Sequence, residues 1–156
     1  MLAHWLTSRW RSGLQADRAT LRRRLKRRIE HSGRFAEGRL EFAIDVDGDV
    51  IGDIEARHPP AGVPPGVYEI GIEIHGEGHR GNGYGSEAVE LLTQHLFDAH
   101  EAARVQASTA VWNTPMRRVL QNLGFGEEGI LRAFMPAEGG RDDYVMYALT
   151  REDRQK

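Results

Sequence analysis

The sequence has no cysteine and no long run of apolar residues. Without cysteine there can be no disulfide framework, thiolate metal site or cysteine nucleophile, and the composition fits a reducing compartment. No segment approaches the roughly 20 apolar residues that a membrane-spanning helix needs. Arg9 interrupts the opening segment, where a signal peptide would be apolar. We therefore expect a soluble, cytoplasmic protein with no membrane partner.

The chain has 156 residues and contains no internal repeat or low-complexity segment. This length is enough to bury a core without help from a metal or a disulfide. We therefore expect one domain over residues 1–156.

Charge is distributed unevenly along the chain. The first 34 residues contain ten Lys or Arg against only two acidic residues, whereas the whole chain has a formal net charge of -2. An apolar stripe at helical spacing runs through the same segment, at Leu14, Leu21, Leu25 and Ile29. We expect a basic helical segment over about residues 1–34, with its arginines on the solvated face, and we do not expect a nucleic-acid partner. An RNA- or ribosome-associated protein that uses this segment stays as an alternative.

Alternating apolar residues predict several strands. The alternation from Leu40 to Ile54 turns at Asp47-Gly48 and predicts a tight hairpin. A second alternation runs from Val67 to Ile74, and a third from Val105 to Val111. The segment from Ile130 to Leu149 predicts a final hairpin.

Two helices are expected between these strands. The first is predicted after Gly85, and the residues at helical spacing that form its expected inner face are Ala88, Leu91, Leu92, His95, Leu96 and Ala99. We expect His95 to be a satisfied core histidine. The second is predicted to begin after Asn113, a cap followed by Pro115, and to end at Gly124.

A glycine-rich loop joins the strand that ends at Ile74 to the first of these helices. It contains Arg80-Gly-Asn-Gly-Tyr-Gly85, so main-chain amides and the positive end of the helix can approach a phosphate. A Walker A loop would need Gly-Lys-Ser/Thr, which is absent. Gly83-x-Gly85-x-x-Ala88 fits a dinucleotide fingerprint, yet the following strand offers no acidic residue for a ribose. A simple tight turn stays as another alternative.

The order of these motifs resembles the GNAT superfamily of acetyltransferases. Arg80-x-x-Gly83-x-Gly85 resembles the acetyl-CoA pyrophosphate loop of that superfamily. Four further segments are similar to motifs of the RimJ/RimL-like branch: the preceding strand, Asn113-x-x-Met116, Leu123-Gly124-Phe125 and Gly140-Arg-Asp-Asp-Tyr144. The resemblance covers about residues 40–153.

The resemblance implies an α/β (α+β) fold: a single mixed, largely antiparallel sheet, flanked by helices on both faces and splayed between the strands at 67–74 and 104–111. It implies an acetyl-CoA-dependent N-acetyltransferase that acts on a primary amine, a protein N-terminus or a small molecule, by direct attack in a ternary complex. A non-catalytic acyl-CoA-binding module stays as an alternative, and a homodimer is left open.

The resemblance also assigns site residues. The implied cofactor-binding set, which lines the pyrophosphate and pantetheine, is Ile72, Ile74, His75, Arg80, Gly81, Asn82, Gly83, Tyr84, Gly85, Ser86 and Asn113. Glu73 is our candidate for the general base, directly or through water. Tyr144 and Tyr147 are candidate proton donors to the leaving thiolate, although tyrosines in terminal strands are more often core residues.

Three features limit these assignments. Many relatives have Ser where this chain has Met116, and a thioether cannot donate a proton. RimJ/RimL-like chains also begin with a strand before the first helices, whereas this chain begins with a segment that resembles a helix. His75 and His79 flank a carboxylate, but the glycines between them oppose the helix of a His-Glu-x-x-His site, so we expect no metal.

Overall fold

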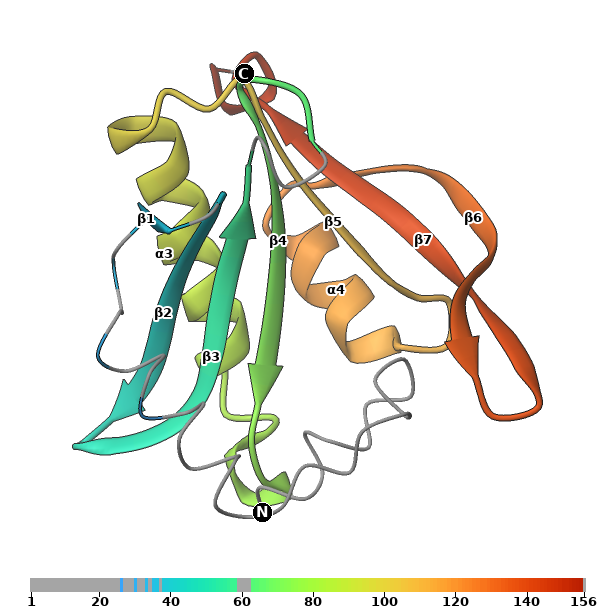
Figure 1. Cartoon of the computed structure of the whole chain (residues 1–156), viewed down its shortest axis with the longest axis horizontal. Helices are drawn as coiled ribbons and strands as arrows, with labels where there is room; N and C mark the ends of the chain where they lie inside the picture. Colours follow the sequence, from blue (N-terminus) through green and yellow to red (C-terminus); the bar gives the residue numbers. More distant parts are fainter. Residues whose placement is uncertain are drawn as a thin grey trace.

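The structure is a computed structural model of the whole chain (Figure 1), and it describes residues 26, 30, 33, 35, 36, 38–58 and 63–155. Lys26 and Glu30 are helical and form an i,i+4 ion pair of 3.8 Å. The rest of the predicted basic helix lies outside the described residues.

A seven-stranded sheet forms the centre of the described structure, in the order β1-β2-β3-β4-β5-β7-β6. Only β4 and β5 are parallel, and every other neighbouring pair is antiparallel. The predicted mixed, largely antiparallel sheet is therefore confirmed. Its strands are β1 (Phe35–Ala36), β2 (Arg39–Val46), β3 (Asp49–Arg57), β4 (Val67–Ile74), β5 (Arg104–Ala110), β6 (Gly126–Ala137) and β7 (Gly140–Thr150).

The turn between β2 and β3 has the chemistry that its sequence predicted. Asp47 and Gly48 both have positive φ, 54° and 89°, as a two-residue turn of type I′ requires. The Gly48 amide also donates to the Asp45 carboxylate at 3.0 Å. The local sequence thus sets the register of this hairpin.

Two helices follow β4 and β5. α3 spans Tyr84–Ala99 and α4 spans Thr114–Asn122. The side chain of Asn113 accepts a hydrogen bond from the Met116 amide, so the predicted cap of α4 is present. Two single-turn 3-10 helices, η2 (Glu77–His79) and η3 (Asp153–Gln155), complete the described elements.

The alternation of the strands gives the sheet two faces, which we call the first and the second face. Residues directly opposite each other in the register share a face, and the first face carries Phe42, Ile54, Ile72, Tyr68, Val105, Ala107 and Tyr147. The second face carries Glu55, Asp53, Glu69, Glu73, Gln106, Ser108, Ala110 and Tyr144.

Both described helices cover the first face. A Cβ at Gly85 in α3 would lie 3.9 Å from Ile72. From α4, Arg117 donates to the hydroxyl of Tyr147 at 3.2 Å. The helical segment that we expected beyond α3 and α4 falls on residues that the structure does not describe, except for Lys26 and Glu30.

The buried side of α3 differs from the one that the sequence predicted. The buried residues are Val89, Leu92, Thr93, Leu96 and Phe97. Leu91 is 59% exposed and His95 is exposed as well, so the expectation of a core histidine was wrong. The helix has apolar residues on two adjacent stripes, and the sequence alone could not tell which one packs on the sheet.

Candidate active site

The centre of the sheet opens between β4 and β5. The last parallel pair joins Glu69 to Gln106, although β4 continues to Ile74 and β5 to Ala110. Figure 1 shows the two strands spreading apart beyond this point. Each strand keeps its outer neighbour, because β3 pairs with β4 as far as Ile74 and β7 pairs with β5 as far as Ala110. The predicted splay is thus present.

Main-chain groups of β4 face this opening. The His75 amide donates to the Ile51 carbonyl in β3 at 2.7 Å. Main-chain groups alternate in direction along an antiparallel ladder. The N–H and C=O of Glu73 therefore also point toward β3, whereas those of Ile72 and Ile74 point toward β5. The Ile74 carbonyl agrees with this, since it accepts from Arg80 Nη2 at 3.3 Å. We infer that the N–H and C=O of Ile72 point into the opening, while the His75 amide is already used within the sheet.

The loop at the start of α3 is open. Gly81 and Gly83 have φ of 79° and 87°, and nothing lies within 4 Å of a Cβ built on either residue. Gly83 is the N-cap of α3 and provides no side-chain bond to the first turn. Among the described residues, the amides of this turn therefore have no capping side chain, and they meet the positive end of a 16-residue helix. Such a cradle fits a phosphate or pyrophosphate group.

The loop is also attached to the strand that lines the opening. Gly85 packs against the side chains of Ile72 and Ile74. Asn82 donates to the Gly78 carbonyl at 3.2 Å, which holds the two ends of the loop together. The structure therefore brings most of the predicted cofactor-binding residues together at one end of β4 on the first face.

Asn113 lies at the end of β5, across the opening from β4. Its Oδ1 accepts from the Met116 amide at 3.3 Å, and its Nδ2 donates to Thr109 Oγ1 at 3.0 Å. The side chain is thus occupied by the helix cap and by β5. A contact with a cofactor would have to use the second amide hydrogen or the main chain.

Glu73 and Tyr144 lie on the second face, on opposite sides of the opening. Glu73 is in β4, and Tyr144 pairs with Ala110 of β5. Burial raises the pKa of Tyr144, and the nearby charge of Asp142 raises it further. The phenol therefore stays protonated at neutral pH, as a proton donor must.

Tyr147 is on the first face and is fully buried, with 0% exposure. Its hydroxyl donates to Glu127 at 2.8 Å and accepts from Arg117 at 3.2 Å. The two candidate tyrosines are therefore on opposite faces, and only Tyr144 shares a face with Glu73. Met116 is half-buried at the start of α4, where it packs against the core.

An aromatic group beside Tyr144 could not be predicted from the sequence. Trp112 is 64% exposed, and its indole donates to Asp142 at 3.1 Å. The Phe134 ring lies 5.5 Å from that of Tyr144. We call Trp112, Phe134 and Tyr144 the aromatic wall.

A bulge in β6 holds Phe134 in this position. The register of β6 on β7 shifts between Leu131 and Met135, and Ala133 within the bulge has a φ of 48°. The Asp143 carboxylate accepts from the Ala133 amide at 2.7 Å, and Arg141 donates to the Phe134 carbonyl at 2.8 Å. A left-handed alanine persists only where its surroundings fix it, so these side chains determine the shape of the wall.

A second group was also missed by sequence reasoning. His75 Nε2 lies 3.3 Å from the Asp53 carboxylate, with 11% and 12% of the two side chains exposed. Asp53 is directly opposite Glu73 in the register of β3 and β4. The alternation of β3 placed Asp53 on a polar face, but only the strand pairing shows which residue it faces.

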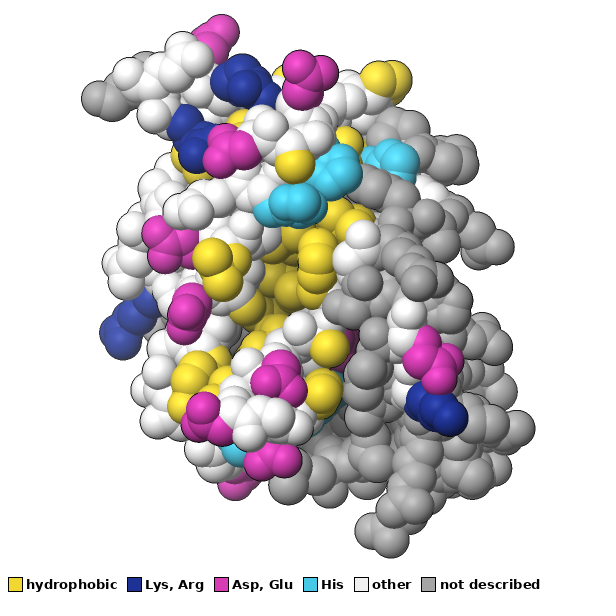
Figure 2. Space-filling model, turned by 90° about the vertical axis from the view of Figure 1, so that its left-hand side faces the viewer, with side chains coloured by type: hydrophobic (Ala, Val, Ile, Leu, Met, Phe, Trp, Pro, Cys, Tyr) yellow, Lys and Arg dark blue, Asp and Glu magenta, His cyan; other side chains and the backbone are white. Residues whose placement is uncertain are grey.

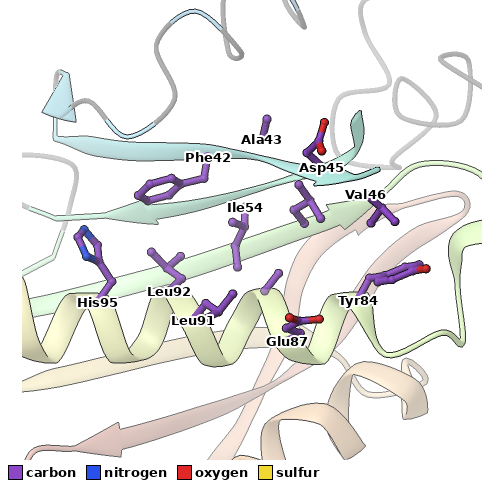
Figure 3. Close-up of a pocket in the computed structure, with 12 residues that line it drawn as sticks. Phe42, Ala43, Asp45, Val46, Ile54, Tyr84, Glu87, Leu91, Leu92 and His95 are labelled. Atoms are coloured by element: carbon purple, nitrogen blue, oxygen red, sulfur yellow. The ribbon is translucent and has the colours of Figure 1, made fainter. Parts of the chain in front are cut away.

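A cavity of about 500 Å³ lies elsewhere, between β2, β3 and α3 on the first face. In Figure 3 the side chains of Phe42, Ile54 and Leu92 point toward one another across it, with His95 at one end and Tyr84 at the other. Figure 2 shows a hollow with an apolar floor and histidines along its rim. Most of its lining is apolar, and it holds neither Glu73 nor Tyr144. This cavity is therefore separate from the opening between β4 and β5.

Two kinds of feature are absent from the described part of the chain. No three His, Asp or Glu side chains there are arranged to hold a metal ion. None of the helices in it has the length and apolar character needed to cross a membrane.

Comparison with known proteins identifies the family. Residues 1–126 match the model of the acetyltransferase (GNAT) domain. The chain is 35% identical to the uncharacterized N-acetyltransferase p20 of Bacillus licheniformis over 88 residues. These aligned residues are 56% of this chain and 49% of p20. The chain thus spans about half the length of the curated relatives that it matches.

Solved structures agree in fold. Mycobacterium smegmatis RimJ, in complex with CoA-disulfide, superposes with a TM-score of 0.70 at 26% identity, over 88% of this chain and 63% of that one. RimL, a ribosomal L7/L12 alpha-N-protein acetyltransferase in complex with coenzyme A, superposes with a TM-score of 0.71 at 19% identity, over 86% of this chain and 73% of that one. At this identity the similarity shows the fold alone. Together with the family match, the open loop and the splayed strands lead to one conclusion: the chain belongs to the GNAT acetyltransferase family.

Proposed function

We propose that this protein transfers the acetyl group of acetyl-CoA to a primary amine, by direct attack in a ternary complex. The observation that carries the proposal is the opening between β4 and β5, with an open phosphate loop on its first face and Glu73 and Tyr144 on its second. Acetyl-CoA would bring an acyl carbon activated as a thioester. The residues of the chain then have to bind it, polarise it and move protons.

Binding would fall to the loop and to β4. The main-chain amides from Gly81 to Ser86 meet the positive end of α3 and would hold the pyrophosphate. The free edge of β4 would pair with the pantetheine arm, much as a strand would. The Ile72 N–H, directed into the opening, would donate to the acetyl oxygen as negative charge develops there.

Proton transfer would take place on the second face. A primary ammonium must lose a proton before it can attack, because its pKa is typically about 8 to 10. Glu73 is the candidate base. Tyr144, kept protonated by burial and by Asp142, is the candidate acid for the leaving thiolate. We prefer it to Tyr147, whose hydroxyl is bonded to Glu127 and Arg117 on the other face.

The acceptor would approach from the second face, beside the aromatic wall. There the exposed indole of Trp112, the phenol of Tyr144 and the carboxylate of Asp142 suit an ammonium group, through cation–π and ionic contacts. RimL is an alpha-N-protein acetyltransferase, and a protein N-terminus is one acceptor class that this wall could hold. A cytoplasmic location and a homodimer stay as predictions.

The test is a screen of amine acceptors, read as CoA released from acetyl-CoA, with binding measured separately by thermal shift. Acetyl-CoA at 100 times its Kd should stabilise the fold by about 2.7 kcal/mol. Glu73→Gln should lower kcat by roughly 100-fold and leave the affinity for acetyl-CoA unchanged. If the melting temperature does not change with acetyl-CoA but clearly rises with NAD or ATP, the proposal is overturned. A shift without turnover on any amine would instead favour a non-catalytic acyl-CoA-binding module.

A further inference from the structure

Asp53 and His75 form a close pair that the reaction described above does not use. They lie on β3 and just after β4, with Nε2 and the carboxylate 3.3 Å apart. About nine-tenths of each side chain is buried, and Asp53 counts among the few buried polar residues of the described structure. Burial of two ionisable groups costs free energy unless each compensates the other, so the pairing needs an explanation.

The pair is next to the candidate base. Asp53 and Glu73 are direct cross-strand partners, and Cβ atoms of such partners are about 4.5 to 5.5 Å apart. His75 follows Glu73 by two residues and is fixed by its main-chain bond to Ile51. The three residues are thus neighbours on the second face, at the end of β4 that borders the opening.

The orientation of the imidazole determines what it can do. With Nε2 directed at a carboxylate, the neutral ring carries its hydrogen on Nε2 and leaves Nδ1 as a proton acceptor. No described residue makes a hydrogen bond to Nδ1. After Nδ1 takes up a proton, the imidazolium is compensated by Asp53.

We propose that His75 and Asp53 act as a proton-relay pair behind Glu73; this inference rests on the proposed acetyl transfer. The acceptor ammonium gives a proton to the Glu73 carboxylate, which breaks an N–H bond and forms an O–H bond. Glu73 passes that proton to His75 Nδ1 and becomes a carboxylate again, and the imidazolium later releases it to solvent. His75 and Asp53 are positioning residues here, because they act through Glu73.

Other charged groups belong to the same surroundings. Glu55 is on the same face of β3, two residues from Asp53, and Glu41 is opposite Glu55 in β2. The loop after His75 carries Glu77, His79 and Arg80. Since any of these can affect a pH profile, the test compares acceptors as well as pH values.

The main variant is His75→Gln, which retains a hydrogen bond donor for Asp53 but cannot carry the proton. We expect kcat at pH 7 to fall about tenfold or more, with the affinity for acetyl-CoA unchanged within about twofold. The defect should shrink as pH rises, because the acceptor then loses its proton without help. It should also be larger for an acceptor with a lysine-type ammonium, pKa about 10.4, than for an α-amine, pKa about 8.

Two further variants separate a relay from a merely structural role. Imidazole added to His75→Ala should restore part of the lost kcat, whereas a structural defect would not respond. Asp53→Asn should show the same dependence on acceptor and pH to a smaller extent, and it replaces His75→Gln if that variant melts before assay. The matched control, His95→Gln, changes an exposed histidine outside the site and should retain wild-type kcat.

The outcomes are distinct. If wild type turns over but His75→Gln keeps its kcat, or loses it equally at every pH and for both acceptors without imidazole rescue of His75→Ala, the relay is wrong. If wild type itself turns over no amine, the proposed function fails instead. A defect that depends on acceptor pKa supports the relay.

Discussion

The two faces of the sheet are made by the same strands and have opposite chemistry. On the first face the strands present apolar residues such as Ile70 and Val105, which are 4% and 0% exposed, and these pack under α3 and α4. On the second face a polar chain crosses four strands, from Arg39 to Glu55, to Arg57, to Glu69 and to Gln106. Strict alternation thus separates the residues that build the core from those that can move protons.

This separation has a consequence for the site. The loop for acetyl-CoA is attached to the first face, whereas the candidate base and acid are on the second, and the two meet only at the opening between β4 and β5. Substitutions on one face should therefore change cofactor binding, and substitutions on the other should change chemistry.

The largest expected effect is on the loop. Gly83→Val introduces a branched side chain at a φ of 87°, where L residues are strained, beside amides that would hold phosphate. Loss of one or two charge-assisted hydrogen bonds should weaken binding of acetyl-CoA by about 100-fold or more, as measured by calorimetry. Gly78→Ala is the matched control, since it has open space and ordinary backbone. Equal affinities of the two variants would contradict the assignment.

The next largest effects should distinguish the roles of Tyr144 and Tyr147. Tyr144→Phe should lower kcat about 10- to 100-fold with little change in stability, because its hydroxyl is assigned to chemistry on the second face. Tyr147→Phe should leave kcat within a few-fold and destabilise the fold by about 1 to 2 kcal/mol, because Glu127 and Arg117 lose a buried partner. Chemical denaturation and steady-state kinetics on both variants decide the matter, and the reverse pattern would favour Tyr147 as the acid.

Most of the fold was accessible from local sequence signals. The alternation from Val67 to Ile74 matches β4 residue for residue, and Asn113 with Pro115 marked the start of α4. Turn residues and periodicity are local properties, so each of these could be predicted from a short window.

The remainder depends on which strands pair. Asp53 faces Glu73, and Phe134 reaches Tyr144, only because of registers between segments that are distant in sequence or contain a bulge. The side of α3 that packs on the sheet was misjudged for a related reason: helical spacing identifies apolar stripes, but the position of the sheet decides which one is buried. Long-range pairing is the information that a local pattern lacks.

The next prediction concerns the pH dependence of the acid. Burial, and then the charge of Asp142, raise the pKa of Tyr144 above its usual value of 10. If Tyr144 is the proton donor, the descending limb of kcat against pH should lie above pH 10. Asp142→Asn removes the second cause and should move that limb to lower pH. An unchanged limb in this variant would show that another group donates the proton.

A smaller effect is expected from the polar chain of the second face. Arg57 Nη2 is 2.5 Å from the Glu69 carboxylate, and 34% and 20% of these side chains are exposed. A double-mutant cycle with Arg57→Met and Glu69→Gln should give a coupling of about 1 kcal/mol or less in stability. The affinity for acetyl-CoA should not change in any of the three variants. A loss of affinity would mean that the two faces are not independent.

The smallest effect should come from the histidines on the first face. Burial, and next the neighbouring His95 and His58, lower the pKa of His100 below 6.5. The His95 and His100 rings are 4.8 Å apart, and both belong to a group that includes Tyr68. Because the unfolded chain takes up this proton more readily than the folded one, His100 costs no stability above about pH 6.5 and destabilises the fold as pH falls below that value.

Thermal melts of wild type at pH 7.5 and pH 5.5 should therefore differ, and His100→Gln should reduce the difference by on the order of 1 °C. Removal of the imidazole takes away the proton uptake on unfolding, so the slope of Tm against pH becomes shallower below about pH 6.5. The same slope in His100→Gln and wild type would show that the proton taken up on unfolding belongs to another group. Turnover at pH 7.5 should be equal in wild type and His100→Gln, because this cluster lies across the sheet from Glu73 and Tyr144.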